Sequence, residues 1–254
     1  DVTHVEGRID PLADAETIET ELMLADLESL EKRLPNLEKK IRANDKEAKL
    51  AFELVNRALE KLRDGKPARY VEIKDDEREA FEALNLLTSK PVLYVCNVDE
   101  GSAATGNDFS RKVEERAAAE GAACVVISAK IEAEIALLPN EERADFLETL
   151  ELEEPGLNRL IRAGYGLLHL VTFFTVGPKE ARAWTVHRGA RAPQAAGVIH
   201  TDFEKGFIRA ETISYDDFVT LGGENGAKEA GRMRLEGKDY VVKDGDVMHF
   251  RFAA

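Results

Sequence analysis

The sequence predicts an α/β protein in three parts: a long helical hairpin, one half of an open domain with parallel strands, and a small β-rich C-terminal domain. Three observations support this prediction. Apolar residues recur at helical spacing between residues 27 and 62, and two short apolar runs flank a helical pattern between residues 91 and 128. After residue 168 the pattern changes to short β-rich runs separated by glycine. Alternation of strand and helix favours parallel pairing with helices on the sheet faces.

The hairpin is predicted from two apolar faces. The first has steps of three and four residues, typical of a helix packed against one partner: Leu27, Leu30, Leu34, Leu37 and Ile41. The second is formed by Ala48, Phe52, Val55, Leu59 and Leu62. Residues 42–46 between them are mostly polar and suit a turn, although one continuous helix is the alternative. Pro35 is expected to kink the first helix or to start a new segment.

The central region is predicted as helix 75–87, strand 91–96, helix 109–120, strand 123–128 and helices 140–150 and 155–164. The C-terminal region is predicted as a small mixed sheet with one or two helices. Its strand candidates are residues 170–176, 181–186, 206–211, 239–242 and 247–252.

Composition limits the classes of function. The 254 residues are 44% hydrophobic and 33% charged, which suffices for a folded core, and the net charge of −14 argues against coating of a nucleic-acid backbone by the whole molecule. Residues 182–254 carry 11 basic and 11 acidic side chains, so the negative charge lies in residues 1–181. The C-terminal third is therefore the part expected to approach a polyanion.

Cysteine usage and hydropathy indicate a reducing cytoplasm. Cys96 and Cys124 lie inside apolar runs, where buried thiols are common. The longest apolar stretch, residues 166–176, is too short for a bilayer, and no signal peptide opens the chain. The sequence lacks an initiator Met, so we expect a fragment of a longer protein.

The candidate site lies where two predicted strands end. The first strand delivers Asn97 and Glu100 at its carboxyl end, where open α/β sheets bind their ligands. The second strand delivers Ser128, Ala129 and Lys130 in the equivalent place. This pairing resembles the base-recognition elements of P-loop GTPases, written N-K-x-D and S-A-K. On the residues alone, Asn97 could instead serve as a strand-end cap.

The resemblance implies that Asn97 contacts a purine, that Val98 lines its pocket, and that Ser128 and Ala129 offer backbone donors. Two departures matter. Glu100 replaces the Asp that accepts two N–H groups of guanine, and Val98 replaces the Lys. A longer carboxylate cannot occupy the same place, so adenine, which offers one donor and one acceptor, is the expected base.

Longer segments resemble the Obg-like ATPase (YchF) family of P-loop NTPases. Residues 1–11 are similar to the segment before that family's coiled-coil insertion, and residues 66–69 and 87–95 to the exit from it. Residues 196–211, AGVIHTDFEKGFIRAE, look like the signature of its C-terminal TGS domain, which has a β-grasp fold. The resemblance covers essentially the whole chain.

The resemblance implies a partial P-loop NTPase domain with an inserted coiled-coil hairpin. The expected boundaries are 1–22 for the first part of that domain, 23–70 for the hairpin, 71–166 for the second part with the base-recognition loops, and 167–254 for the TGS-like domain. It implies a cytoplasmic, monomeric, ribosome-associated translation factor that binds and hydrolyses ATP with Mg²⁺. Neither a membrane nor DNA is an expected partner.

The phosphate-binding motifs of the family are absent from the sequence. No G-x-x-x-x-G-K-[ST] occurs, and the D-x-x-G element and the catalytic switch His are missing too. No residue here is assigned a catalytic role, and the Mg²⁺ ligands are expected outside this segment. Because phosphoryl transfer depends on charge neutralisation at the phosphates, the segment alone is predicted to be inactive, whereas the resemblance implies that the intact protein is an ATPase.

The alternative function is a ribosome or RNA adaptor in which the nucleotide site is vestigial or regulatory. Candidate RNA contacts are the basic residues of the last domain: Arg188, Arg191, Lys205, Arg209, Arg232 and Arg234. The spacing of the five His residues and their distance from Cys argue against a zinc site, so no metal ligands are assigned. His200 with Asp202 is interpreted as a cap or turn.

Overall fold

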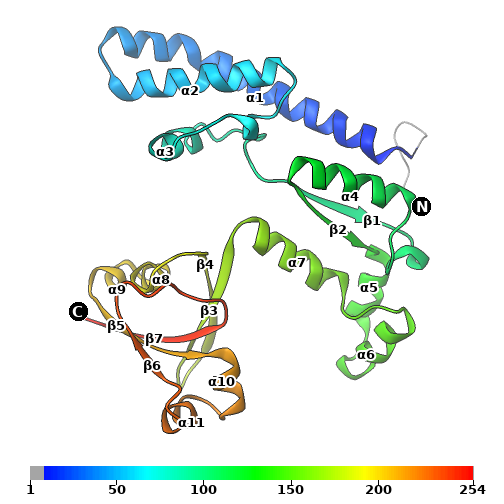
Figure 1. The fold of residues 1–254 in the computed structure, drawn as a ribbon, viewed down its shortest axis with the longest axis vertical. Helices are drawn as coiled ribbons and strands as arrows, with labels where there is room; N and C mark the ends of the chain where they lie inside the picture. Colours follow the sequence, from blue (N-terminus) through cyan, green and yellow to red (C-terminus); the bar gives the residue numbers. More distant parts are fainter. Residues whose placement is uncertain (1–8, 254) are drawn as a thin grey trace. The chain divides into compact units, whose positions relative to one another are not determined.

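The structure, a computed structural model, describes residues 9–253. It divides into two compact units that meet between residues 163 and 164 (Figure 1). Helix α7 (Gly156–Leu167) runs across this boundary. The mixed α/β class and the parallel strand pair predicted from the sequence are both confirmed.

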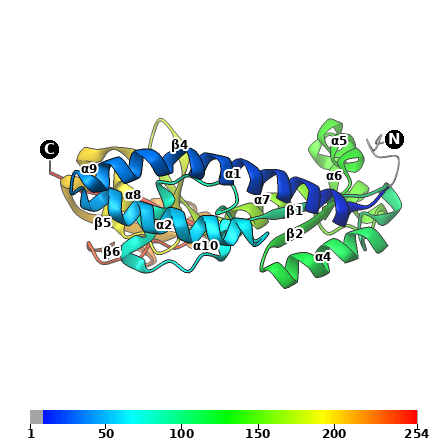
Figure 2. The same ribbon diagram turned by 90° about the horizontal axis from the view of Figure 1, so that it is seen from above.

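The N-terminal unit begins with a helical hairpin. Helices α1 (Pro11–Arg42) and α2 (Lys46–Arg63) lie side by side (Figures 1 and 2) and are separated by a short turn, so the alternative of one continuous helix is wrong. Asn44 adopts φ 66° in this turn, and the Asp45 carboxylate accepts a hydrogen bond from Ala48 N at 3.0 Å, which caps α2. Helix α1 starts at Pro11, well before the expected hairpin boundary at residue 23.

Helix α1 continues through Pro35, which therefore does not start a new segment. Proline removes one backbone donor and leaves the carbonyl four residues earlier without its partner. Pro35 and Glu31 are both exposed, so water can hydrate that carbonyl. The position on the solvent side explains why the helix tolerates the residue.

The hairpin core follows the predicted apolar faces. Leu30, Leu54 and Leu59 are almost fully buried in this core. Its other members from the two predicted faces are Leu27, Leu34, Leu37, Val55 and Leu62, whereas Ile41, Ala48 and Phe52 do not belong to it. One polar group joins this core. The Asp26 carboxylate, 3% exposed, accepts hydrogen bonds from Leu87 N, Thr88 N and Thr88 Oγ1 at 2.8, 2.8 and 2.7 Å. It thereby ties α1 to the segment that leads out of the hairpin.

Strands β1 (Leu93–Asn97) and β2 (Ala123–Ile127) form a parallel pair in which Asn97 lies opposite Ile127. Helix α4 (Asp108–Glu120) connects them and packs on both. Helices α5 (Ala129–Leu137) and α6 (Asn140–Thr149) follow, of which α5 was not predicted. The helix expected at 75–87 is reduced to α3 (Arg78–Glu82) after one 3-10 turn, and Asn85 at φ 51° lies just beyond its end.

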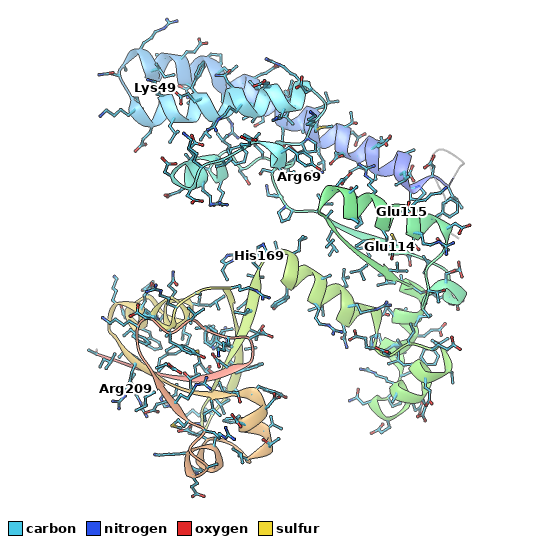
Figure 3. All side chains as sticks on the ribbon, in the orientation of Figure 1. Lys49, Arg69, Glu114, Glu115, His169 and Arg209 are labelled. Carbon is cyan, nitrogen blue, oxygen red and sulfur yellow. The ribbon has the colours of Figure 1, made fainter. Side chains whose placement is uncertain are left out.

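A half-buried polar cluster joins the hairpin to this parallel pair. Arg116 on α4 contacts Glu19 of α1 at 3.0 Å and Glu120 at 2.7 Å. Tyr94 of β1 donates a hydrogen bond to Glu120 at 2.9 Å, and Arg69, labelled in Figure 3, pairs with Glu19. Alternating charges at low exposure fix the position of α1 against α4 within this unit.

The C-terminal unit contains a mixed sheet, as predicted, and this sheet has five strands. Its order is β4 (Ala181–His187), β3 (Leu170–Val176), β7 (Asp246–Phe252), β5 (Phe207–Ser214) and β6 (Arg234–Glu236). Only β3 and β7 pair in parallel. The described helices are α8 (Ala192–Ile199), α9 (Thr201–Lys205), α10 (Tyr215–Thr220) and α11 (Glu224–Glu229), more than the one or two expected.

The strand predicted at residues 239–242 does not form. Val241 makes only an isolated bridge to Arg191, because Tyr240 N donates to Gly237 O and Lys243 N donates to Asp246 in consecutive turns. The core of this sheet contains Phe173, Met248 and Phe250, packed against α8. None of the helices described for residues 9–253 is long and apolar enough to cross a membrane.

Candidate functional site

The two sequence-predicted loops lie next to each other at the carboxyl end of the parallel pair. Val98 N donates a hydrogen bond to Ile127 O at 2.9 Å, which continues the pairing one residue past β1. Both chains then leave the sheet at the same edge. Asn97, Glu100, Ala129 and Lys130 are exposed there.

Asn97 links the loops directly. Its Oδ1 accepts a hydrogen bond from Ala129 N, the first backbone amide of α5, at 2.9 Å. Because a backbone N–H can only donate, the oxygen of the Asn97 amide must face α5, and the Nδ2 group remains as a donor. Among residues 9–253, no group accepts a hydrogen bond from Asn97 Nδ2.

This bond changes the set of backbone donors expected from the second loop. Ala129 N is engaged by Asn97, so the amides of Lys130 and Ile131 are the donors that remain in the first turn of α5, and Lys130 is the exposed residue of the two. Val98 is half-buried beside the same edge. Ser128 is 3% exposed, and no described residue hydrogen-bonds to its Oγ.

A second link runs beside the first. Lys130 Nζ lies 2.7 Å from Glu100 Oε1, and the two side chains are 68% and 46% exposed. The hydrogen bond to Glu100 raises the pKa of the Lys130 ammonium, which therefore stays protonated at neutral pH. The sequence placed both residues at the site but did not indicate that they pair with each other.

Asp99 has a local role. Its carboxylate accepts hydrogen bonds from Ser102 N at 3.1 Å and from the Ser102 hydroxyl, which caps the 3-10 turn η3 (Glu100–Ser102). Asp99 is thus held within its own loop, and Glu100 is the carboxylate that reaches α5. The Asp-x-x-Ser spacing is the sequence signal for this cap.

The arrangement suits the base of a nucleotide better than its phosphates. Asn97 supplies a free amide donor next to an accessible amide of α5, and Glu100 and Lys130 supply an acceptor and a donor. A phosphate cradle needs successive backbone amides of a glycine-rich loop and a hydroxyl for Mg²⁺, and the sequence contains no such motif. The two loops therefore present donors and an acceptor at this edge of the sheet, and the sequence contains no motif for phosphoryl chemistry.

The two cysteines form no disulfide. Cys96 Sγ and Cys124 Sγ lie 3.8 Å apart across β1 and β2, and both side chains are half-buried. Burial raises the pKa of both thiols, that of Cys124 to about 12. They remain protonated at neutral pH and pack as apolar groups.

The six basic candidates for RNA contact fall into two sets. Arg191 pairs with Asp239, Arg232 with Asp217, and Arg234 with Glu236 and Asp246. The other set, Arg188, Lys205 and Arg209, makes no ion pair with any residue that the structure describes, and Arg209 points outward from β5 (Figure 3). This second set therefore lacks ion-pair partners, although Arg209 still interacts electrostatically with Glu211.

His200 has the capping role that the sequence predicted: its Nδ1 accepts a hydrogen bond from Asp202 N at 3.2 Å at the start of α9.

A group of potential metal ligands within the described residues lies elsewhere, with donor atoms of Glu211, Glu224 and His249 within 4.8 Å of one another. Arg251 contacts both Glu211 oxygens, at 3.4 and 3.0 Å, and lowers the pKa of that carboxyl. The Arg251 guanidinium therefore already neutralises the negative charge of Glu211, which a metal ion would need as a ligand.

Known proteins are similar to this chain over nearly its whole length. Residues 170–253 match the YchF-GTPase_C family, described as a protein of unknown function (DUF933). The "Ribosome-binding ATPase YchF" of Haemophilus ducreyi is 56% identical over 99% of this chain and 69% of its own length. The protein of the same name from Bacillus subtilis is 52% identical with the same coverage, and "Obg-like ATPase 1" of Oryza sativa subsp. japonica is 39% identical.

Solved structures show the same relationship. The YchF GTPase of Schizosaccharomyces pombe superposes with a TM-score of 0.81 at 32% identity, covering 99% of this chain and 68% of that one. A GTP binding protein from Pyrococcus horikoshii OT3 shares the fold, with a TM-score of 0.61 at 18% identity. Together with the identity of more than half of all residues to the bacterial proteins, these matches show that the chain belongs to the YchF family of P-loop NTPases.

Proposed function

We propose that this chain is the base-selecting and ribosome-associating part of a cytoplasmic ATPase, and that its purine site prefers adenine to guanine. The observation that carries the proposal is the hydrogen bond from Ala129 N to Asn97 Oδ1, flanked by the Glu100–Lys130 ion pair. Together these contacts join two loops at the edge of the sheet where α/β domains bind ligands.

Each side chain has an assigned role in the proposal. Asn97 Nδ2 donates a hydrogen bond to the purine, Val98 lines the pocket, and the backbone amide of Lys130 and the buried Ser128 complete the rim. The names of the relatives support nucleotide hydrolysis by the intact protein, and they differ on the base, since the bacterial relatives are called ATPases and the S. pombe structure a GTPase. The expected preference for ATP therefore depends on this site. Mg²⁺ would be held with the phosphates by residues outside this segment.

The test is a titration with non-hydrolysable ATP and GTP analogues, using the chain extended at its N-terminus to the length of its bacterial relatives. Selective ATP binding is expected. Asn97→Ala should weaken it about tenfold, because one base hydrogen bond and the link to Ala129 are lost together. Asn56→Ala is the matched control, since Asn56 Nδ2 donates only to Phe52 O on α2. A preference for GTP would contradict the interpretation that Glu100 favours adenine over guanine.

A ribosome or RNA adaptor is the second candidate, and it is favoured by the exposed basic side chains that make no ion pair with a described residue: Arg188, Lys205 and Arg209. In that case ribosome co-sedimentation should not depend on nucleotide, and replacing these three residues by Gln should weaken it and flatten its salt dependence. Arg191→Gln is the control, because Arg191 is already paired with Asp239. The C-terminal unit would then act as the TGS-like β-grasp module, with the protein a monomer.

A further inference from the structure

The ion pair between Glu100 and Lys130 places two unlike groups next to each other at the purine site. Lys130 Nζ and Glu100 Oε1 are 2.7 Å apart, and both side chains are exposed to an incoming ligand. Glu100 lies at the start of η3 and Lys130 in the first turn of α5, so the pair closes the same gap between loops that the Asn97 hydrogen bond spans.

Asn97 cannot by itself distinguish the two purines. With its oxygen committed to Ala129 N, it presents only the Nδ2 donor, and adenine and guanine both carry ring nitrogen acceptors. Discrimination must therefore come from groups that meet the edge on which the two bases differ. Glu100 and Lys130 are the charged side chains that the structure places across this gap.

A lone carboxylate at this position would favour guanine. Guanine presents two neighbouring N–H donors on its Watson–Crick edge, and an ionised carboxylate offers two acceptor oxygens. Adenine presents one donor, the exocyclic amino group, beside one acceptor, N1. A free carboxylate would accept from the amino group but would repel the lone pair of N1.

Lys130 changes this pattern. One oxygen of Glu100 is held by Nζ, which leaves Oε2 as an acceptor, and the ammonium retains two further N–H donors. The pair thus offers an acceptor and a donor side by side. If guanine bound in the same orientation, its acceptor O6 would face the carboxylate and its donor N1–H would face the ammonium. Both contacts would be unfavourable, because each would bring together two acceptors or two donors.

We propose that Lys130 and Glu100 act together as the adenine-reading element, with Glu100 Oε2 accepting from the exocyclic amino group and Lys130 Nζ donating to N1. Lys130 is then a specificity-determining residue, because without it the remaining carboxylate favours the opposite base. This inference rests on the proposed function, in that it assigns the chemistry by which that site chooses its base.

The test uses purine nucleosides, which need no phosphate loop. Adenosine, guanosine and 1-deazaadenosine, which lacks the N1 acceptor, are titrated against the 254-residue chain while the backbone amide resonances of Ala129 and Lys130 are followed by NMR. The wild-type chain should bind adenosine more tightly than either analogue. Lys130→Met should reduce the adenosine-to-guanosine affinity ratio about tenfold and remove the penalty for 1-deazaadenosine.

Two controls make the result specific. Lys39→Met removes an exposed lysine from α1 and should leave every ratio unchanged. Asn97→Ala should weaken all three nucleosides by a similar factor, since its donor meets an acceptor that they share.

The outcomes separate the two proposals. A wild-type chain that binds no purine, or prefers guanosine, overturns the proposed function and this inference with it. If the wild type prefers adenosine and Asn97→Ala weakens binding, while Lys130→Met keeps both the ratio and the 1-deazaadenosine penalty, then Lys130 does not read the base and only the inference fails.

Discussion

Replacement of Asp26 by alanine is expected to destabilise the N-terminal unit by about 3 kcal/mol. The Asp26 carboxylate is 3% exposed and accepts three hydrogen bonds, two of them from the backbone of the segment that leaves the hairpin. The truncated side chain would leave the donors without partners. The cost depends on whether water can reach each of them.

The three donors differ in this respect. Thr88 is 2% exposed, so its N–H would be buried without a partner, at a cost of about 1–3 kcal/mol. Leu87 is 46% exposed, so its N–H can be hydrated at little cost. The Thr88 hydroxyl loses its acceptor but still accepts from Ala68 N at 3.0 Å. Loss of the charge-assisted bonds adds about 1–2 kcal/mol after the desolvation of the carboxylate is recovered.

Urea denaturation followed by far-UV circular dichroism measures this change, because most of the helical signal of the unit comes from α1 and α2. Amide hydrogen exchange should show faster opening at Ala68 and Thr88 than at Leu59 in the middle of the hairpin. Asp64→Ala, at the exposed end of α2, is the control and should stay within about 0.5 kcal/mol of wild type. A loss below 1 kcal/mol for Asp26→Ala would refute the reasoning.

Two further predictions concern alkaline stability and hydrolysis. Burial, and then the hydrogen bond to Asp246, raise the pKa of Tyr240 from 10.0 to about 12, so its stabilising contribution is complete below pH 10 and is lost as the pH rises to about 12. Tyr240→Phe should therefore flatten the decline in stability between pH 9 and 12, measured by Trp184 fluorescence in urea; an unchanged slope would contradict this. The 254-residue chain should release no phosphate from ATP above background, whereas the chain extended at its N-terminus should hydrolyse ATP. Equal rates of phosphate release by the two chains would refute the assignment of phosphate chemistry to the extension.

Several features followed from local sequence because their causes are local. The steps of three and four in the apolar residues from Leu27 to Leu37 are a property of one helix, and they predicted the face that packs on α2. The apolar runs that became β1 and β2, and the crossover between them, predicted a parallel pair, which the structure confirms. The expected positions of Asn97 and Ser128 at strand ends follow from the same pattern.

Other features were missed because their causes are not local. The segment 239–242 is apolar enough for a strand, but turns around Gly237 and Lys243 remove it from the sheet. Strand β6 has only three residues and exists because β5 offers it an edge. Helix α5 was missed although Ile131 and Ile135 are spaced for one helical face, and both become buried only when that helix packs.

The sequence by itself determined the kinds of chemical group at the candidate site: an amide, a carboxylate, an ammonium and a set of backbone donors at two strand ends. Only the tertiary structure decided how these groups are shared, with Asn97 bonded to Ala129 N and Glu100 paired with Lys130. The physical reason is that a hydrogen bond or ion pair depends on separations of about 3 Å between atoms. Residues more than two dozen positions apart in the chain reach that separation only once β1 and β2 are aligned.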